Sequence, residues 1–231
     1  MIRKCKPEAN SKVIYFSSKE KLNDGYIVDG NIIKECENKL RKHILNTKEI
    51  KLRGTHNFEN ICAALAATRE LVDEKTAVEA IKEFNSVEHR LEFVREINGV
   101  KWYNDSASSS PSRTIAGLNA YDEEIVLIAG GYDKNLDYDI LGKYIVKKVK
   151  ALVLIGNTAK KILDATTKEM EKQGVELPIC FCQTLEDAVK AAKQVAKENQ
   201  VVLFSPASAS FDMFKNFADR GNQFKKLVNE L

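Results

Sequence analysis

The sequence is poor in the residues and spacings that build metal sites and covalent cross-links. It has three histidines, His43, His56 and His89, which are too scattered to indicate a metal site. Its five cysteines form no C-x-x-C pair and have no histidine at metal-ligand spacing. We therefore assign no metal ligands and expect reduced thiols, as in a cytoplasmic protein.

Membrane and nucleic-acid signals are also absent. No signal peptide opens the chain, and no apolar run approaches the roughly 20 residues that span a bilayer. Thirty-six basic and 33 acidic residues are interspersed and give a net charge of +3, so no basic footprint for nucleic acid is present. We expect a cytoplasmic protein with no membrane or nucleic-acid partner.

The two common phosphate-binding motifs are missing. No G-x-x-x-x-G-K-[ST] sequence occurs, and no G-x-G-x-x-G follows a predicted strand. The chain therefore does not hold a complete nucleotide site of either kind.

What the chain does have is the composition of a folded globular protein. It is 231 residues long, 44% hydrophobic and 30% charged, with only four prolines. Such a chain is long enough for one large domain or two smaller ones.

The first part of the chain predicts short strands and a pair of helices. Strands are expected at Val13–Phe16 and Ile50–Leu52, with a hairpin through Gly25 and Gly30 between them. Helices are expected at Phe58–Val72 and Lys75–Phe84, where apolar residues recur at helical spacing. These elements are too few to enclose a full core, which indicates part of a larger domain.

From Leu91 onward, strands and helices alternate. The expected strands are 91–97, 100–104, 125–129, 151–155, 178–182 and 201–204, and the expected helices are 112–119, 139–147, 159–173, 185–198 and 211–228. Alternation with continuously apolar strands predicts an α/β fold with a mostly parallel sheet covered on both faces. Ligands of such sheets bind at the carboxyl ends of the strands.

Three of the loops that leave these strands are unusual. They read NDSASSSPS from Asn104, GGYDK from Gly130 and SPASAS from Ser205. They offer hydroxyls, backbone donors, Lys134 and Asp105, which suit a small ligand with carboxylates or phosphates. Each loop alone also has a structural explanation: Gly130-Gly131 as a tight turn, and the serines as helix caps. The phenylalanines that follow Ser210 are expected in the core.

Several motifs, in matching order from about Val13 to the C-terminus, resemble those of the Mur ligase family. They are LRGTHNFEN at 52–60, HRLE at 89–92, NDS at 104–106, Gly130-Gly131 with Lys134, and SPASASFD at 205–212 with Phe214, Phe217 and Arg220-Gly221. The resemblance implies that residues 1–90 are the tail of the central ATP-binding domain and that 91–231 are a Rossmann-like C-terminal domain. The first domain and the P-loop of the family have no counterpart here.

The 205–221 stretch is most like the branch of the family that adds D-glutamate to UDP-N-acetylmuramoyl-L-alanine in peptidoglycan synthesis. That activity uses ATP and Mg²⁺ to activate the substrate carboxylate as an acyl phosphate, which the amine of D-glutamate attacks. The resemblance implies ATP contacts from His56, Asn57, Asn60, Arg90 and Asp105. It implies D-glutamate contacts from Ser109, Lys134, Ser210 and Phe217, with Lys134 and Arg90 as the catalytic residues and no metal ligand in this chain.

One position departs from the family pattern. Many members carry a lysine after Asp-Ser in the first loop, where this chain has Ala107. We hypothesise that Arg113 or another cation replaces it, or that the site depends more on Lys134.

Two other functions stay open at this point: another amide ligase of the superfamily, such as a folylpolyglutamate synthase, and a non-catalytic module that binds a small ligand or nucleotide. We expect the chain alone to be a monomer that folds but neither hydrolyses ATP nor forms product. Residues 87–91 are the predicted hinge between the two domains.

Overall fold

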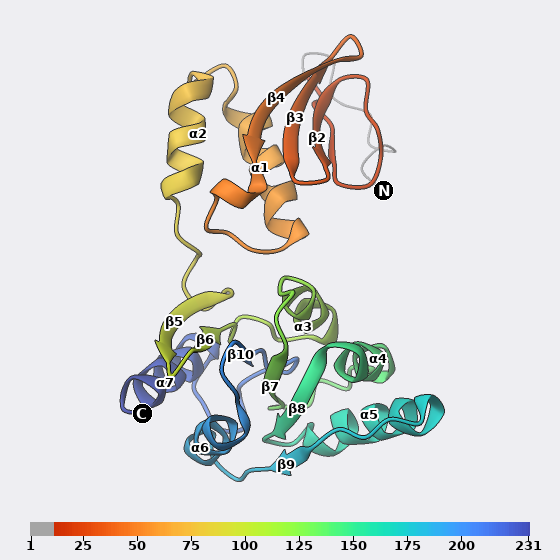
Figure 1. Ribbon diagram of the computed structural model, residues 1–231, viewed down its shortest axis with the longest axis vertical. Helices are drawn as coiled ribbons and strands as arrows, with labels where there is room; N and C mark the ends of the chain where they lie inside the picture. The colour runs from red at the N-terminus through yellow and green to blue at the C-terminus, as the bar shows by residue number, and fades with distance from the viewer. Residues whose placement is uncertain (1–11) are drawn as a thin grey trace. The chain divides into compact units, whose positions relative to one another are not determined.

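The computed structural model describes residues 12–231, which form two compact units. The first unit ends at Asn85, and the second comprises Ser86–Leu231 (Figure 1). The predicted hinge, residues 87–91, lies at the start of the second unit. The identification of the first 90 residues with a central domain stays a prediction, and Cys5 lies outside the described residues.

The first unit is a four-stranded sheet covered by two helices. Its strands are β1 (Phe16–Ser17), β2 (Gly25–Asp29), β3 (Ile32–Glu37) and β4 (Leu40–Asn46), in the order β1-β2-β3-β4, with β1 parallel to β2 and the other pairs antiparallel. The helices are α1 (Thr55–Thr68) and α2 (Glu74–Glu83). Their apolar faces pack on the sheet around Tyr26, Ile33, Leu45, Ile61 and Leu65. The expected hairpin at Gly30 is confirmed.

Three expectations for this unit were wrong. The strand expected at 13–16 is only Phe16–Ser17. The segment 50–52 is not a strand, because the chain makes a short 3-10 turn at Thr47–Glu49 and then runs irregularly into α1. The strand that precedes this turn is β4, which ends at Asn46. It was not predicted because its first four residues are exposed and do not alternate between apolar and polar types. Helix α1 begins three residues before the predicted start and ends four before the predicted end.

The second unit is a six-stranded sheet in the order β5-β6-β10-β7-β8-β9. The strands are β5 (Glu92–Ile97), β6 (Val100–Asn104), β7 (Ile125–Ala129), β8 (Val149–Leu154), β9 (Ile179–Phe181) and β10 (Val201–Phe204). All neighbours are parallel except β5 and β6, which form an antiparallel pair at one edge. The predicted mostly parallel α/β fold is confirmed.

Helices cover both faces of this sheet (Figure 1). One core includes apolar residues of α3 (Pro111–Leu118), α4 (Asp139–Lys148) and α5 (Ala159–Gln173). The core on the other face includes residues of α6 (Leu185–Val195) and α7 (Phe217–Asn229), with Trp102 packed beside Phe224. β7 and β10 are buried along their whole length, as their continuous apolar sequences predict. Among the described residues no helix is long and apolar enough to cross a membrane.

The start of the last helix differs from the expectation. Helix α7 begins at Phe217, not Phe211, because the Asn216 side chain accepts a hydrogen bond from the backbone N–H of Asp219 and caps it there. Residues 211–216 form turns. Phe211 and Phe217 are 60% and 48% exposed, so they are not core residues, whereas Phe204 and Phe224 are fully buried and stacked.

Candidate functional site at the strand exits

The three unusual loops leave adjacent strands at the same edge of the sheet. β10 lies between β6 and β7 and is parallel to both. Phe204, the last residue of β10, is in register with Asn104 at the end of β6 and with Ile128 near the end of β7. The predicted convergence of the three strand exits is therefore confirmed.

Backbone hydrogen bonds tie the β7 and β10 loops together. The N–H of Gly130 donates to the Pro206 carbonyl at 2.8 Å, and that of Tyr132 donates to the Ala209 carbonyl at 2.9 Å. A side chain at Gly131 would not fit, because its Cβ would lie 2.4 Å from the carbonyl oxygen of Ala209. The glycine pair therefore serves close packing between the two loops.

Arg220, on the first turns of α7, joins the β6 loop to the β10 loop. Its side chain is fully buried, with Nε and Nη2 bound to Ser106 and Nη1 bound to the carbonyls of Ser208 and Ala209 at 3.1 and 2.8 Å. Burial lowers the pKa of Arg220 to about 10, which still leaves the guanidinium charged at neutral pH. A buried cation thus holds the two loops in one fixed arrangement.

Buried hydroxyls extend this packing from the β10 loop to α5. The Ser208 hydroxyl lies 2.9 Å from the Tyr138 hydroxyl and 2.7 Å from that of Thr158. Thr158 Oγ1 in turn accepts a hydrogen bond from the N–H of Gly131. These buried side chains hold the loops in place from the interior of the second unit, where a ligand cannot contact them.

Asp105 is turned into the protein. It is 3% exposed, and its carboxylate accepts hydrogen bonds from the Ser205 hydroxyl at 2.7 Å and the Leu91 N–H at 3.3 Å. Burial raises the pKa of Asp105 to about 6, against the opposing effect of hydrogen bonds from Ser108 and Ser205. Its direct contacts here fix the β6 loop and the chain before β5.

Arg90 is exposed, and the backbone on either side of it is fixed by hydrogen bonds to two carboxylates. The residues on either side of it, His89 and Leu91, have positive φ values of 64° and 45°, which are costly for residues other than glycine. They are held by the Glu92 carboxylate, which accepts from the His89 N–H, and by Asp105, which accepts from the Leu91 N–H. Arg90 has no carboxylate within ion-pair distance among residues 12–231, so its guanidinium is available to an anion.

His89 is buried behind Arg90 beside the start of α7. Its Nδ1 lies 2.9 Å from Asn104 Nδ2, and its ring meets that of Phe217 edge-on at 6.0 Å. Burial lowers the pKa of His89, so the ring is neutral at neutral pH. A Cβ on Gly221 would lie only 2.3 Å from His89 Nδ1, which explains why glycine is needed there.

The predicted amino-acid contacts surround the joined loops. Ser210 is buried, and the exposed Lys134 places its ammonium 5.6 Å from the centre of the Phe211 ring. The half-exposed Phe217 accepts a hydrogen bond at its backbone carbonyl from the Ser106 hydroxyl, at 2.7 Å. Ser109 is half-buried between the β6 loop and α3. All four residues belong to the second unit and to the edge of the sheet where β6, β7 and β10 end.

Arg113 adds a cation beside the β6 loop. It lies in the first turn of α3, is exposed, and donates from Nη1 to the carbonyl of Ala107 at 3.1 Å. No carboxylate pairs with it among the described residues. The guanidinium therefore lies next to Ala107, the position where the family resemblance implies a lysine.

His56, Asn57 and Asn60 lie in the first two turns of α1, in the other compact unit. The Asn57 amide donates to the Arg53 carbonyl at 2.7 Å, and the Asn60 amide lies 3.4 Å from Asn57 Oδ1. The three residues share one helix start, but the structure does not test their contacts with a nucleotide. No group of three or more metal-ligating side chains is present in residues 12–231.

Sequence reasoning gave no role to Arg220 or to the buried hydroxyls. A signal for Arg220 was available, because it falls between Phe217 and Phe224 on the apolar face of α7, where a charged residue requires buried partners. No comparable signal marked Ser208 or Thr158, since their partnership depends on how two separate loops pack.

Comparisons with known proteins agree with one another. Residues 89–208 match the family described as Mur ligase, glutamate ligase domain. The chain is 49% identical over 226 residues to the UDP-N-acetylmuramoylalanine–D-glutamate ligase of Acetivibrio thermocellus, and 44% identical over 226 residues to that of Clostridium tetani. Each match covers 97% of this chain and 48% of the relative, so the chain spans about half the length of the curated relatives it matches.

Solved structures support the same fold. The UDP-N-acetylmuramate-alanine ligase MurC of Thermotoga maritima superposes with a TM-score of 0.64 at 18% identity, covering 94% of this chain and 48% of that one. A folylpolyglutamate synthase of Mycobacterium tuberculosis gives a TM-score of 0.58 at 13% identity, covering 86% and 48%. At these identities the likeness shows the fold alone.

Proposed function

The chain belongs to the Mur ligase family, and we propose that it is the part of a D-glutamate-adding ligase that carries the amino-acid site. Two observations support this proposal. The curated relatives at 44–49% identity are named UDP-N-acetylmuramoylalanine–D-glutamate ligases. The loops after β6, β7 and β10, which carry several hydroxyls and Lys134, leave the sheet at one edge, and Arg113 lies in the first turn of the helix that follows the β6 loop.

In this proposal the second unit binds D-glutamate between its loops. A ligand with two carboxylates needs cations and hydrogen-bond donors at both ends. Lys134 supplies the cation beside the β10 loop, where Ser210 is also located, and Arg113 supplies one beside the β6 loop with Ser109. Phe217 offers an apolar surface between them. Because Arg220 fixes both loops, the amine of the bound amino acid is presented in a constant orientation.

Arg90 and Asp105 are proposed to serve the nucleotide side, together with His56, Asn57 and Asn60. ATP supplies the phosphoryl group that activates the carboxylate of UDP-N-acetylmuramoyl-L-alanine. The exposed guanidinium of Arg90 suits a phosphate, which it can contact with two parallel hydrogen bonds. Asp105 acts by holding the backbone next to Arg90 and not by direct contact. The family resemblance implies Mg²⁺ as the partner of ATP, and we assign it no ligand in residues 12–231, which contain no group of three or more metal-ligating side chains.

The proposed reaction belongs to peptidoglycan synthesis in the cytoplasm, and through it to cell-wall growth, cell shape and cell division. The MurC and folylpolyglutamate synthase likenesses do not favour a different substrate, since they show only the fold. The alternative, a non-catalytic module, would bind the same small ligand at these loops but would not couple its binding to the use of ATP.

Titration of the chain with D-glutamate by NMR tests the amino-acid site. We expect shifts of the backbone signals of residues 105–113, 130–134 and 205–217, no response to L-glutamate at the same concentration, and a loss of affinity of about tenfold in Lys134→Ala. Lys160→Ala on α5, where the lysine pairs with Asp164 at the surface, is the matched control. Shifts confined to other elements would contradict the proposal.

A chimera tests the activity itself. This chain can replace the matching half of the Acetivibrio thermocellus relative, with which it shares 49% identity. We expect ATP-dependent product formation with D-glutamate and none with other amino acids in a panel. Folded chimeras that use a different amino acid would exclude the D-glutamate assignment, and the chain alone should hydrolyse no ATP.

A further inference from the structure

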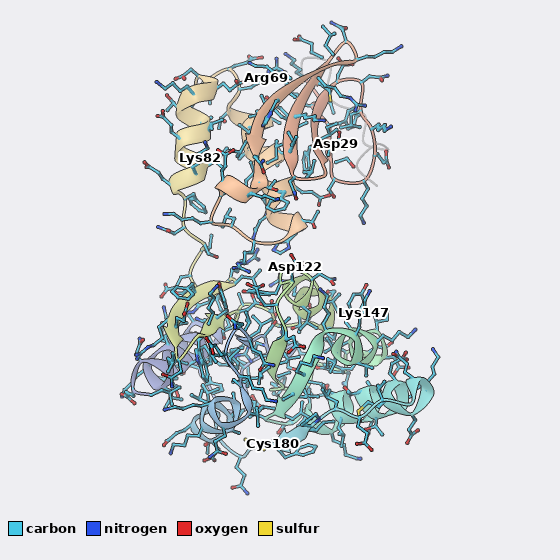
Figure 2. The ribbon with its side chains drawn as sticks, viewed as in Figure 1. Asp29, Arg69, Lys82, Asp122, Lys147 and Cys180 are labelled. Atoms are coloured by element: carbon cyan, nitrogen blue, oxygen red, sulfur yellow. The ribbon has the colours of Figure 1, made fainter. Side chains whose placement is uncertain are left out.

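Two thiols lie side by side on and just after β9, the edge strand of the second unit, and belong to none of the three loops described above. Cys180 is on β9, and Cys182 follows the end of that strand. Their sulfur atoms are 3.8 Å apart, and both cysteines are free. Figure 2 labels Cys180. Cys180 is exposed and Cys182 is partly exposed, so small reagents can reach the pair.

The arrangement follows from strand geometry. Residues two apart in a strand point to the same face, which brings the two thiols together. β9 pairs only with β8, so its other edge has no neighbouring strand in the described sheet. The N–H of Cys182 donates to the Leu154 carbonyl at 2.9 Å, which fixes the backbone on the inner side. The two thiols therefore have a fixed backbone and are also accessible to solvent.

A direct disulfide fits this geometry poorly. Alternate residues of a strand have Cα atoms roughly 6.6–6.8 Å apart, at the upper limit for disulfide-bonded cysteines. The sulfurs would also have to close from 3.8 Å to about 2.05 Å. A single bridging atom fits better: with bonds of about 2.3 Å, the length of a zinc–thiolate bond, it would span 3.8 Å at an angle of about 110°.

We propose that Cys180 and Cys182 form a bidentate site for a thiophilic centre that needs only two protein ligands, of which a trivalent organoarsenical is the chemical class. A bare metal ion is less suitable, because no third metal-ligating side chain is arranged with them in the described chain. An organoarsenical carries its own third substituent, so two thiolates complete its coordination.

The reaction balances without a redox partner. An arsenoxide, R–As=O, condenses with both thiols; two S–H bonds break, two As–S bonds form, and the oxygen leaves with both protons as water. Arsenic stays trivalent throughout. Burial, together with the neighbouring Cys180, raises the pKa of Cys182 to about 12, so we expect this thiol to react slowly with alkylating reagents that need a thiolate.

The test uses the folded chain and phenylarsine oxide, followed by trypsin and mass spectrometry. Both thiols fall on one tryptic peptide, residues 173–190, whereas Cys5, Cys36 and Cys62 fall on others. We expect one phenylarsenic group on that peptide, no thiol left there for iodoacetamide, and removal by a 1,2-dithiol. Excess glutathione should release it at least roughly tenfold more slowly than from Cys180→Ser or Cys182→Ser, because the second bond acts at high effective concentration.

Cys5→Ser is the matched control and should leave the adduct unchanged. Arsenic found mainly on other peptides, or wild-type adduct released by glutathione as fast as that of either serine variant, would overturn the proposal. If a serine variant does not fold, peptide mapping of the wild-type chain still decides, since bridging is read from the absence of free thiols on residues 173–190.

Discussion

Arg220 binds Ser106 through two hydrogen bonds, from Nε to the hydroxyl at 3.0 Å and from Nη2 to the backbone carbonyl at 2.8 Å. The same guanidinium binds two carbonyls of the β10 loop. One side chain from the last helix therefore determines how two loops that are far apart in sequence, but leave adjacent strands, meet. This relationship leads to the first prediction.

Replacing Arg220 by methionine keeps an unbranched side chain of smaller volume but leaves three buried carbonyls and a hydroxyl with fewer partners. We expect the second unit to lose about 3 kcal/mol or more of its free energy of unfolding. Urea unfolding monitored by circular dichroism measures it. Arg95→Met, which removes one hydrogen bond to the Asn229 carbonyl, is the control and should cost much less. An equal loss of unfolding free energy in Arg220→Met and Arg95→Met would mean that the buried hydrogen bonds of Arg220 contribute no more than the single bond of Arg95.

Arg113 should contribute to amino-acid binding. Arg113→Ala removes the cation next to Ala107, and we expect D-glutamate affinity to fall about fivefold, a modest effect because the guanidinium is exposed. Arg113→Lys should restore part of the affinity, since it retains the charge. NMR titration provides the measurement. Unchanged affinity in Arg113→Ala would remove Arg113 from the site and leave Lys134 as the main cation.

Asp105 should make the stability of the second unit depend on pH. Its pKa is raised to about 6 in the folded chain, above the unfolded value near 4, so the folded state binds the proton more tightly. The contribution of Asp105 to the free energy of unfolding should therefore be fully present below pH 4. It should be lost as the pH rises through 6. In Asp105→Asn this fall, at most about 3 kcal/mol, should disappear.

Urea unfolding at pH 4, 5, 6 and 7 compares the two proteins. The difference between Asp105→Asn and the wild type should move in favour of the variant as pH rises. Asp122→Asn, at an exposed position, should follow the wild-type pH profile. A constant difference across the four pH values would show that Asp105 is not protonated preferentially in the folded state.

Gly221→Ala should disturb the segment that presents Arg90. The new Cβ would lie 2.3 Å from His89 Nδ1 and 3.1 Å from Asn104 Nδ2, both buried, so neither neighbour can move freely. We expect a loss of about 2 kcal/mol of unfolding free energy. Gly174→Ala, at a helix end with φ of +65° and no atom beyond its chain neighbours within 4 Å of the new Cβ, should cost only about 1 kcal/mol. Thermal unfolding of both variants provides the comparison, and an equal or smaller loss for Gly221→Ala would contradict the packing argument.

The sheet of the second unit was predicted well because its central strands are buried on both faces, which gives them a simple sequence pattern. β7 and β10 are buried on both faces, so their sequences are continuously apolar and their ends are marked by glycine or serine. β6, β7 and β10 were predicted with the bounds observed, and the convergence of their loops followed from parallel pairing alone.

The wrong predictions have two causes: a strand that depends on tertiary pairing, and a helix cap that apolar spacing does not show. β4 begins with four exposed residues, Leu40, Arg41, Lys42 and His43, and is a strand because of its pairing with β3, which no local signal shows. Phe211, Phe214 and Phe217 have helical spacing, but the cap at Asn216 starts the helix six residues later than predicted. The predicted contact of Asp105 with a ligand stays a prediction, but the sequence did not indicate that Ser205 and Leu91, distant from it in the chain, bind its carboxylate. For β4 and Asp105 the deciding partner lies on another element, whereas the Asn216 cap is local to the start of α7.

The position of β10 has a consequence for biosynthesis. β10 is near the end of the chain but lies in the middle of the sheet, between β6 and β7. During translation these two earlier strands emerge from the ribosome long before the strand that separates them, and they must stay apart until it arrives. A nascent chain stalled before residue 201 therefore cannot form the native sheet, and the three loops of the candidate site come together only after β10 has been synthesised.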